Sequence, residues 1–459
     1  MSYQDWRTRA IRNVSSMVVG EFVNRYRRGR PTVVLMPGGM GSQLDRSLEP
    51  FADGALPPTV YDTVWIDLGT LVLGQALTLA IEPDGRDRDG HVIVANGALR
   101  FLVNAYDATE AYFGRSDVDM NYVVFGYDWR RPLDESAAFL EDFLTRLQAR
   151  VRETFDEDPL ADLTLLAHSQ GGLVAKVFLH RVGDATRWMR RVITVGTPFY
   201  GTWSHQRRYF VGEPALDPIH PGSVMAPIIA TLPGPYGLMF PPRTVFEDIG
   251  AAIGLTRYPM RDPAGGDGAD PFDAATLGRF YPDWVDAARL RDAAQMFRTI
   301  AAPLPQPVAE RVYTVRSVVE PAMPVELSWR PLPAGFDPDR NDSPVQPAGF
   351  GPGDGTVPAW SAWHTAVPRA NRVEFTEGEP HTTLMEDPRV LGFVRRLIEG
   401  RSVAEALAAP AAGVRPRPAA PDAQVRSVLD DLAAGRIGPR DPRLNDPRLW
   451  RGIQRELMR

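Results

Sequence analysis

The stretch Leu163–Gly172 reads LTLLAHSQGG and is the most informative part of the chain. A run with the composition of a buried strand leads through Ala167, His168 and Ser169 into two glycines, and a segment with helical periodicity (172–181, GLVAKVFLHR) follows. This order is typical of a nucleophile elbow, a strained turn that holds a serine hydroxyl at the carboxyl edge of a sheet. The common pattern is G-x-S-x-G, and Ala167 in the first glycine position is still small. We predict Ser169 as a nucleophile, and a structural role for His168, which should point away from it.

Six short runs rich in β-branched residues have the composition of buried strands, and helical segments lie between several of them. The runs are Thr32–Met36, Tyr122–Phe125, Leu163–Ala167, Arg191–Val195, Arg311–Val315 and Arg372–Phe375. Apolar strands that alternate with helices imply a mostly parallel sheet covered on both faces. We therefore predict an α/β protein with the α/β-hydrolase fold, a mostly parallel central sheet and an inserted cap or lid.

The domain organisation follows from shifts in composition along the chain. Between about residues 200 and 307 proline and glycine are dense, and a long irregular insertion of this kind is usually functional, so we predict the cap or lid there. The other predicted parts are an N-terminal helical segment, a catalytic domain, an Ala/Pro-rich linker and a helical tail, at residues 1–30, 31–400, 401–423 and 424–459.

The N-terminal helical segment combines an apolar stripe with several arginines. A helix lying on a membrane surface is one interpretation. We favour a helix packed on the domain, because Asp5 and Glu21 interrupt the basic face and the stripe is short.

The bulk composition narrows the function classes. The 459 residues contain no cysteine, which excludes disulfides, a thiolate nucleophile and cysteine-ligated metals. The formal net charge of −6 gives no indication of nucleic-acid binding, and nearly all the positive charge is arginine, since Lys176 is the single lysine. We find neither a signal-peptide apolar region nor an 18-residue apolar window. We therefore expect a cytoplasmic protein, and we predict no metal and no cofactor.

A glycine-rich turn follows the first predicted strand, where the chain reads LMPGGMGSQLD. Such a turn can present free backbone N–H groups. Acyl transfer needs two such donors at the position where negative charge develops. We predict the N–H groups of Gly39 and Gln170 as this oxyanion hole. A phosphate-binding loop is the alternative, but the turn lacks the lysine of a P-loop and the spacing of a dinucleotide fingerprint.

A serine nucleophile needs a base and an orienting carboxylate, which hydrolases of this fold place in the order Ser, Asp or Glu, His. Only His364 and His381 lie in the C-terminal part, and we favour His381 because it occupies a polar loop after the last predicted strand. For the acid we favour Asp354, which lies between glycines in the loop GPGDGTVP. Glu379 and Asp387 remain alternatives, although both lie close to His381 in sequence.

Taken together, these segments resemble the lecithin:cholesterol acyltransferase family, which includes lysosomal phospholipase A2 and phospholipid:diacylglycerol acyltransferases. The matching stretches are PGGMGSQLD (37–45), YDWRRP (127–132), AHSQGG (167–172), VGTPFYGT (195–202), TLPGPYGLMFP (231–241), GDGTVPAWS (353–361) and His381. The resemblance implies a triad of Ser169, Asp354 and His381, with Gly39 and Gln170 as oxyanion donors. It also implies that the YDWR stretch lies near an acyl pocket and that the insertion holds a lid. Secreted members have a disulfide-tethered lid, which this chain cannot form.

The expected activity is a two-step acyl transfer from a lipid ester through an acyl-enzyme on Ser169, with water or an alcohol as acceptor. Expected partners are a lipid ester, with an alcohol acceptor and peripheral membrane contact as options, and no nucleic acid. A carboxylesterase for non-lipid esters and a non-catalytic binding protein with the hydrolase fold remain alternatives. Five apolar residues of the insertion are equally compatible with an acyl tunnel and with an ordinary core: Trp203, Tyr236, Leu238, Met239 and Phe240.

Overall fold

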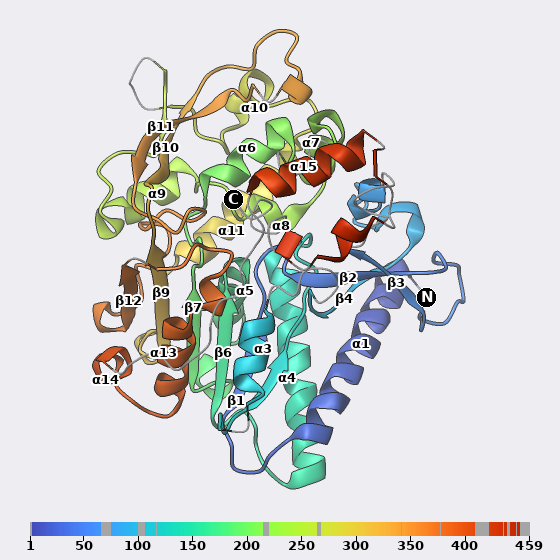
Figure 1. Cartoon of the computed structure of the whole chain (residues 1–459), viewed down its shortest axis with the longest axis vertical. Helices are drawn as coiled ribbons and strands as arrows, with labels where there is room; N and C mark the ends of the chain where they lie inside the picture. Colours follow the sequence, from blue (N-terminus) through green and yellow to red (C-terminus); the bar gives the residue numbers. More distant parts are fainter. Residues whose placement is uncertain are drawn as a thin grey trace.

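The computed structural model shows a central sheet with helices on both sides and a cap above one end (Figure 1). It describes residues 2–65, 75–99, 106–115, 117–213, 220–263, 268–340, 342–376, 378–408, 422–434, 436–437, 441–446 and 448–449. Within these ranges no helix is both long enough and apolar enough to cross a membrane.

Six strands form the central sheet in the order β12–β9–β7–β6–β1–β5, and all neighbouring strands are parallel. Their bounds are β1 Thr32–Met36, β5 Asn121–Val124, β6 Leu163–His168, β7 Arg191–Val195, β9 Val312–Val318 and β12 Arg372–Thr376. These are the six predicted strands, each shifted by three residues or fewer at its ends. The predicted fold class is confirmed.

Helices cover both faces because alternate strand residues point to opposite sides and both sets are apolar. The helices α4 (Leu133–Phe155) and α5 (Gln170–Arg181) bury apolar side chains in one cluster with one face of the sheet. The opposite face forms a second cluster with α3 (Asp107–Phe113) and α13 (Pro388–Ile398). The N-terminal helix α1 (Tyr3–Arg25) packs along α4 and against β4. This arrangement brings the carboxyl ends of all six strands to the edge that faces the cap.

The cap contains more regular structure than its composition indicated. Its helices were not recognised in the sequence because they are short and separated by proline and glycine. Its helices are α6 Trp203–Val211, α7 Gly222–Ala230, α8 Pro233–Tyr236, α9 Arg243–Ile249, α10 Ala274–Phe280, α11 Ala287–Ala301 and α12 Gln306–Ala309. Beside them lies a sheet of β8 Met260–Arg261, β10 Met323–Trp329 and β11 Val345–Gly351.

A third sheet, β3–β2–β4, carries the chain away from the glycine-rich turn after β1. Its strands are β2 Ser42–Ser47, β3 Tyr61–Trp65 and β4 Ile93–Ala98. At the other end of the chain are α14 Val403–Ala408 and α15 Asp422–Ala433. Residues 409–421 of the predicted linker and 450–459 of the predicted tail lie outside the described residues.

Candidate active site

Ser169 occupies a strained turn between β6 and α5. Its φ and ψ are 51° and −125°, which is an unfavourable conformation for a residue with a side chain. The following turn is tight: a Cβ atom on Gly171 would lie 2.5 Å from the carbonyl oxygen of Pro37. The Ser169 N–H donates to the carbonyl of Val195 at 2.9 Å, which ties the turn to the neighbouring strand. The backbone therefore has the geometry expected of a nucleophile elbow.

Three side chains that lie far apart in sequence meet at this turn. His381 Nε2 is 3.0 Å from Ser169 Oγ, and His381 Nδ1 is 2.7 Å from Asp354 Oδ2. The three residues expose only 8 %, 2 % and 2 % of their surface, in the order Ser169, Asp354, His381. A carboxylate can only accept, so the neutral imidazole carries its proton on Nδ1 and faces the serine hydroxyl with the Nε2 lone pair. The structure therefore brings the predicted nucleophile, base and acid together with their expected polarity.

The loop after β11 holds the Asp354 carboxylate in a fixed orientation. Its Oδ1 accepts hydrogen bonds from the N–H groups of Thr356 at 3.0 Å and Val357 at 2.6 Å, which leaves Oδ2 for His381. The His381 N–H in turn donates to the Asp354 carbonyl at 2.9 Å. Gly196 completes the packing, because it has a φ of 59° and a Cβ there would lie 3.1 Å from His381 Nδ1. The acid and the base are thus positioned by their backbones as well as by their side chains.

The two predicted oxyanion donors lie beside each other next to the serine. Gln170 is the first residue of α5, and N–H groups of the first helical turn have no acceptor within the helix. Gly39 approaches it closely, since a Cβ on Gly39 would lie 2.8 Å from Gln170 Oε1. Gly39, Ser169 and Gln170 all line one pocket. The positive end of the α5 dipole also favours negative charge at this point.

His168 links the glycine-rich turn to the base, a connection that the sequence analysis missed. The Gly38 N–H donates to the Tyr106 hydroxyl at 2.7 Å, and that hydroxyl lies 2.9 Å from His168 Nδ1. The hydroxyl has one proton and donates it to Nδ1, so Nε2–H of His168 donates to the carbonyl of His381, 3.2 Å away. Burial, with a smaller contribution from His381, lowers the pKa of His168 well below its usual value, so the ring stays neutral. We call this chain of hydrogen bonds the Tyr106–His168 relay. It connects the glycine-rich turn at Gly38 to the backbone of His381.

The pocket in front of Ser169 is mainly apolar, and the space between its walls, counted out to the open mouth, is about 780 Å³. Its apolar lining comes from the turn after β1, from the end of β3 and the segment between β3 and β4, from the YDWR stretch and from the cap: Met40, Trp65, Leu79, Trp129, Met225, Ile228, Ile229, Leu232, Pro235 and Leu238. Of the five cap residues with two open interpretations, Leu238 lines this pocket. Tyr236, Met239 and Phe240 are fully buried in a separate cap core, and Trp203 packs against that core.

Two further polar residues of α6 line the pocket and were not predicted. Arg208 Nη1 donates to His205 Nε2 at 2.9 Å, and Arg208 Nε is 2.7 Å from the carboxylate of Glu213. Burial, Arg208 and His381 lower the pKa of His205 well below its usual value. No motif marks these residues, because their place in the pocket depends on how the cap folds over the sheet.

The alternative acid and base residues are engaged elsewhere. His364 Nε2 donates to the carbonyl of Ile300, and its ring packs edge-on against Phe199. Asp387 caps α13 by accepting from the Arg389 N–H, and Glu379 accepts from Thr383 Oγ1. Within the described residues, no group of three or more His, Asp or Glu side chains is arranged to hold a metal ion.

Comparisons with known proteins identify similar sequences and a similar fold. The family model for lecithin:cholesterol acyltransferase matches residues 116–224, a segment that contains Ser169 and Gln170. The lysosomal phospholipase A and acyltransferase of Canis lupus familiaris is 23 % identical over 426 residues, which cover 81 % of this chain and 92 % of that protein. Its counterpart from Homo sapiens is 23 % identical over 418 residues, covering 81 % and 91 %.

The resemblance to the lecithin:cholesterol acyltransferase family is confirmed. A Saccharomyces cerevisiae protein described as uncharacterized is 31 % identical over 170 residues, and this match covers 36 % of this chain and 23 % of that protein. Among solved structures, the Tle4–Tli4 complex contains a chain with a TM-score of 0.53 and 15 % identity, which covers 84 % of this chain and 100 % of that one. This last likeness extends only to the fold.

Proposed function

We propose that this chain is a serine-dependent acyl hydrolase or O-acyltransferase that acts on lipid esters. The observation that carries the proposal is the pair of contacts that His381 makes, with Ser169 Oγ at 3.0 Å and with Asp354 at 2.7 Å. A serine hydroxyl is a weak nucleophile at neutral pH, and a neighbouring base held by a carboxylate activates it.

The mechanism follows from the positions of these groups. His381 Nε2 removes the proton from Ser169 as Oγ attacks the ester carbonyl carbon, and Asp354 stabilises the imidazolium that forms. The N–H groups of Gly39 and Gln170 donate hydrogen bonds to the developing oxyanion. His381 then gives the proton to the leaving alcohol, and an acyl-enzyme remains on Ser169. In the second step His381 activates water or an acceptor alcohol, which takes the acyl group and restores the serine.

The pocket supports a lipid ester as the substrate class. Ten apolar residues line the space in front of Ser169, and an acyl chain placed there would be removed from water. The named relatives are phospholipases A and acyltransferases, and more than nine-tenths of their length is matched. From these relatives we infer that a phospholipid is the acyl donor. Contact with a membrane surface and a cytoplasmic location remain predictions.

The first test is covalent labelling of the purified chain with a long-chain alkyl fluorophosphonate, followed by intact mass measurement and peptide mapping. We expect one adduct on Ser169 and none in Ser169→Ala, whose circular dichroism and melting temperature should match those of the unchanged protein. An unlabelled protein, with and without detergent or lipid vesicles, would contradict the proposal and favour the non-catalytic alternative.

The second test separates the two enzymatic classes. Phosphatidylcholine vesicles are supplied with and without a long-chain alcohol, and released fatty acid and newly formed ester are measured together with hydrolysis of water-soluble p-nitrophenyl esters. We expect vesicle lipids to be cleaved with a higher kcat/KM than the soluble ester. Cleavage of only the soluble ester would instead indicate a carboxylesterase.

A further inference from the structure

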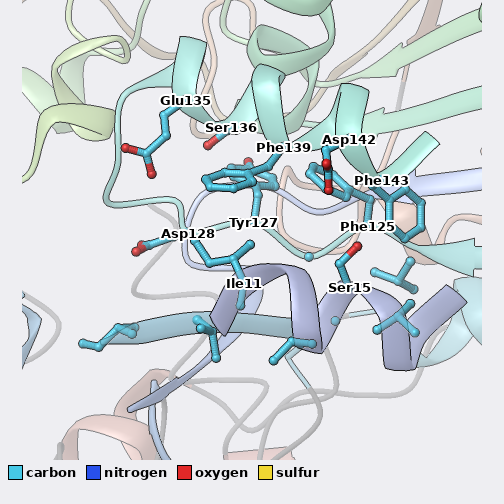
Figure 2. Close-up of a pocket in the computed structure, with 18 of the residues that line it drawn as sticks. Ile11, Ser15, Phe125, Tyr127, Asp128, Glu135, Ser136, Phe139, Asp142 and Phe143 are labelled. Carbon is cyan, nitrogen blue, oxygen red and sulfur yellow. The ribbon is translucent and has the colours of Figure 1, made fainter. Parts of the chain in front are cut away.

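A second pocket lies between α1 and α4, against β4 and β5, and is separate from the pocket at Ser169 (Figure 2). The space between its walls, counted out to the open mouth, is about 620 Å³, and we call it the α1–α4 pocket. The two pockets share one wall, because Asp128 lines the α1–α4 pocket and the next residue, Trp129, lines the catalytic pocket. Tyr127, also in the α1–α4 pocket, donates its hydroxyl to the carbonyl of Pro37 at the start of the oxyanion turn. The triad does not use this space.

The long side of the α1–α4 pocket is apolar. The helix α1 contributes Ile11, Val14 and Val18, and aromatic rings of α4, among them Phe139 and Phe143, face them across the gap (Figure 2). From Arg7 to Val18 the helix rises about 16 Å at about 1.5 Å per residue. The pocket is therefore an elongated and mainly apolar channel, which suits a single acyl chain. Its polar lining residues along this side include Ser15 and Asp142, and the Asp142 carboxylate is paired with Arg146.

One end of the channel is polar and incompletely satisfied. Arg7 exposes only 2 % of its surface, and its Nη1 lies 2.7 Å from Glu135. Its Nε and Nη2 lie 4.0 Å and 3.9 Å from the carboxylates of Asp87 and Asp128, which is too far for hydrogen bonds, and neither atom has another partner. Ser15 Oγ is also buried without a partner, but it lies about 12 Å further along α1 and is not part of this end. Buried donors without acceptors are costly, at about 1–3 kcal/mol each, so acceptor oxygens belong at this end of the pocket.

The charges at the polar end already balance. Three arginines and three carboxylates form one cluster, buried except for the Glu135 side chain, which is 31 % exposed: Arg7, Arg130 and Arg131 with Asp87, Asp128 and Glu135. A ligand with a net charge would leave that charge uncompensated in a buried site, whereas hydroxyl and ester oxygens would satisfy the open donors at no electrostatic cost.

We propose that the α1–α4 pocket binds a neutral single-chain lipid with a hydroxylated head group, of the monoacylglycerol class. The acyl chain lies between α1 and α4, and the head-group oxygens accept hydrogen bonds from Arg7 Nε and Nη2. The proposal stands on geometry that is independent of Ser169.

The test uses the full chain with Ser169→Ala, so that no ligand is turned over. A 1-monoacylglycerol with a C12 acyl chain and a diazirine on that chain is cross-linked by light, and the labelled peptides are mapped by mass spectrometry. We expect labelling in α1 and α4. Unlabelled 1-monolauroylglycerol should compete with this labelling, and the laurate anion should compete at least about tenfold more weakly.

Two variants on one helix provide the matched comparison. Ser15→Trp places a large ring inside the α1–α4 pocket, whereas Met17→Trp adds the same ring at a site that is 66 % exposed. We expect Ser15→Trp to abolish labelling of α1 and α4 and Met17→Trp to leave it unchanged. Val18→Trp fills the pocket from another position and replaces Ser15→Trp if that variant does not fold.

The labelling pattern decides the proposal whatever the outcome at Ser169. Cross-links confined to peptides of the catalytic pocket would overturn the second site and leave the proposed function intact. Equal labelling in Ser15→Trp and Met17→Trp would also overturn it, as would laurate competing as well as 1-monolauroylglycerol.

Discussion

Replacing Tyr106 by phenylalanine tests whether the Tyr106–His168 relay positions the catalytic groups. The substitution removes one oxygen atom and keeps the ring, which is 1 % exposed. That oxygen accepts from the Gly38 N–H at 2.7 Å and contacts His168 Nδ1 at 2.9 Å. Tyr106→Phe therefore leaves one backbone donor and one ring nitrogen without a partner in a region that water does not reach.

The expected loss of stability follows from these two groups. Each buried polar group that loses its partner costs about 1–3 kcal/mol, so the free energy of unfolding should fall by about 2–6 kcal/mol. For a chain of this length, each kcal/mol lost from the free energy of unfolding lowers the melting temperature by about 1 °C, so the melting temperature should fall by a few degrees.

The expected loss of activity follows from the neighbour of Gly38. Gly39 is a proposed oxyanion donor, and its turn would lose the bond that ties it, through His168, to the backbone of His381. A displacement on the order of 1 Å can cost about 10²-fold, so we expect kcat to fall by about 10- to 100-fold with little change in KM. Hydrolysis of p-nitrophenyl butyrate and the second-order rate of fluorophosphonate labelling both report this loss.

Tyr258→Phe is the matched control. Its hydroxyl is also buried and donates to the carbonyl of Pro241 at 2.9 Å, but Tyr258 lies in the cap core away from the residues that line the catalytic pocket. It should lower the melting temperature while kcat stays within about twofold of the unchanged protein. If Tyr106→Phe also keeps its kcat within about twofold, the relay has no positioning role and the reasoning is refuted.

Two further predictions concern single side chains. Asp354→Asn keeps the shape of the acid but cannot hold the required tautomer of His381. We expect kcat to fall by about 10³- to 10⁴-fold while the circular dichroism spectrum stays unchanged. A loss below tenfold would mean that another residue is the acid. Burial lowers the pKa of Lys176 to about 7 from an unfolded value of 10.5, so between these pH values the unfolded chain binds a proton that the folded chain lacks. The free energy of unfolding should therefore rise with pH in this window, by up to about 1.4 kcal/mol per pH unit relative to Lys176→Met. Urea unfolding of both proteins at pH 7.5 and 9.0 measures this. The same change with pH in both proteins would contradict the prediction.

The central sheet could be predicted because most of its strands are buried on both faces, the edge strand β12 being the exception, with Glu374 and Thr376 exposed. Such strands appear in the sequence as short continuous apolar runs, and those at Leu163–His168 and Arg191–Val195 need no partner to be recognised. The strands of the two small sheets have no such composition. In β2 the burial pattern mixes buried and half-buried positions over SQLDRS, and nothing in those letters distinguishes a strand from a loop.

The residues of the proposed triad stand out in the sequence for a different reason, namely that each is part of a local backbone requirement. Ser169 needs the turn that small neighbours permit, and Asp354 needs a loop whose N–H groups at Thr356 and Val357 can turn toward its own carboxylate. Requirements of this kind involve neighbours in sequence, so they leave a motif.

Tyr106 and His205 leave no motif because their contacts join distant parts of the chain. Tyr106 contacts His168 across 62 positions, and His205 enters the pocket only because α6 folds over the carboxyl ends of the strands. A sequence pattern cannot report such a contact, since any buried hydrogen-bonding residue at these positions would look the same. The residues proposed to orient the chemistry therefore depend on tertiary packing, whereas the residues proposed to react depend on local turns. Mutations at Tyr106 should alter catalysis without touching the proposed reacting atoms.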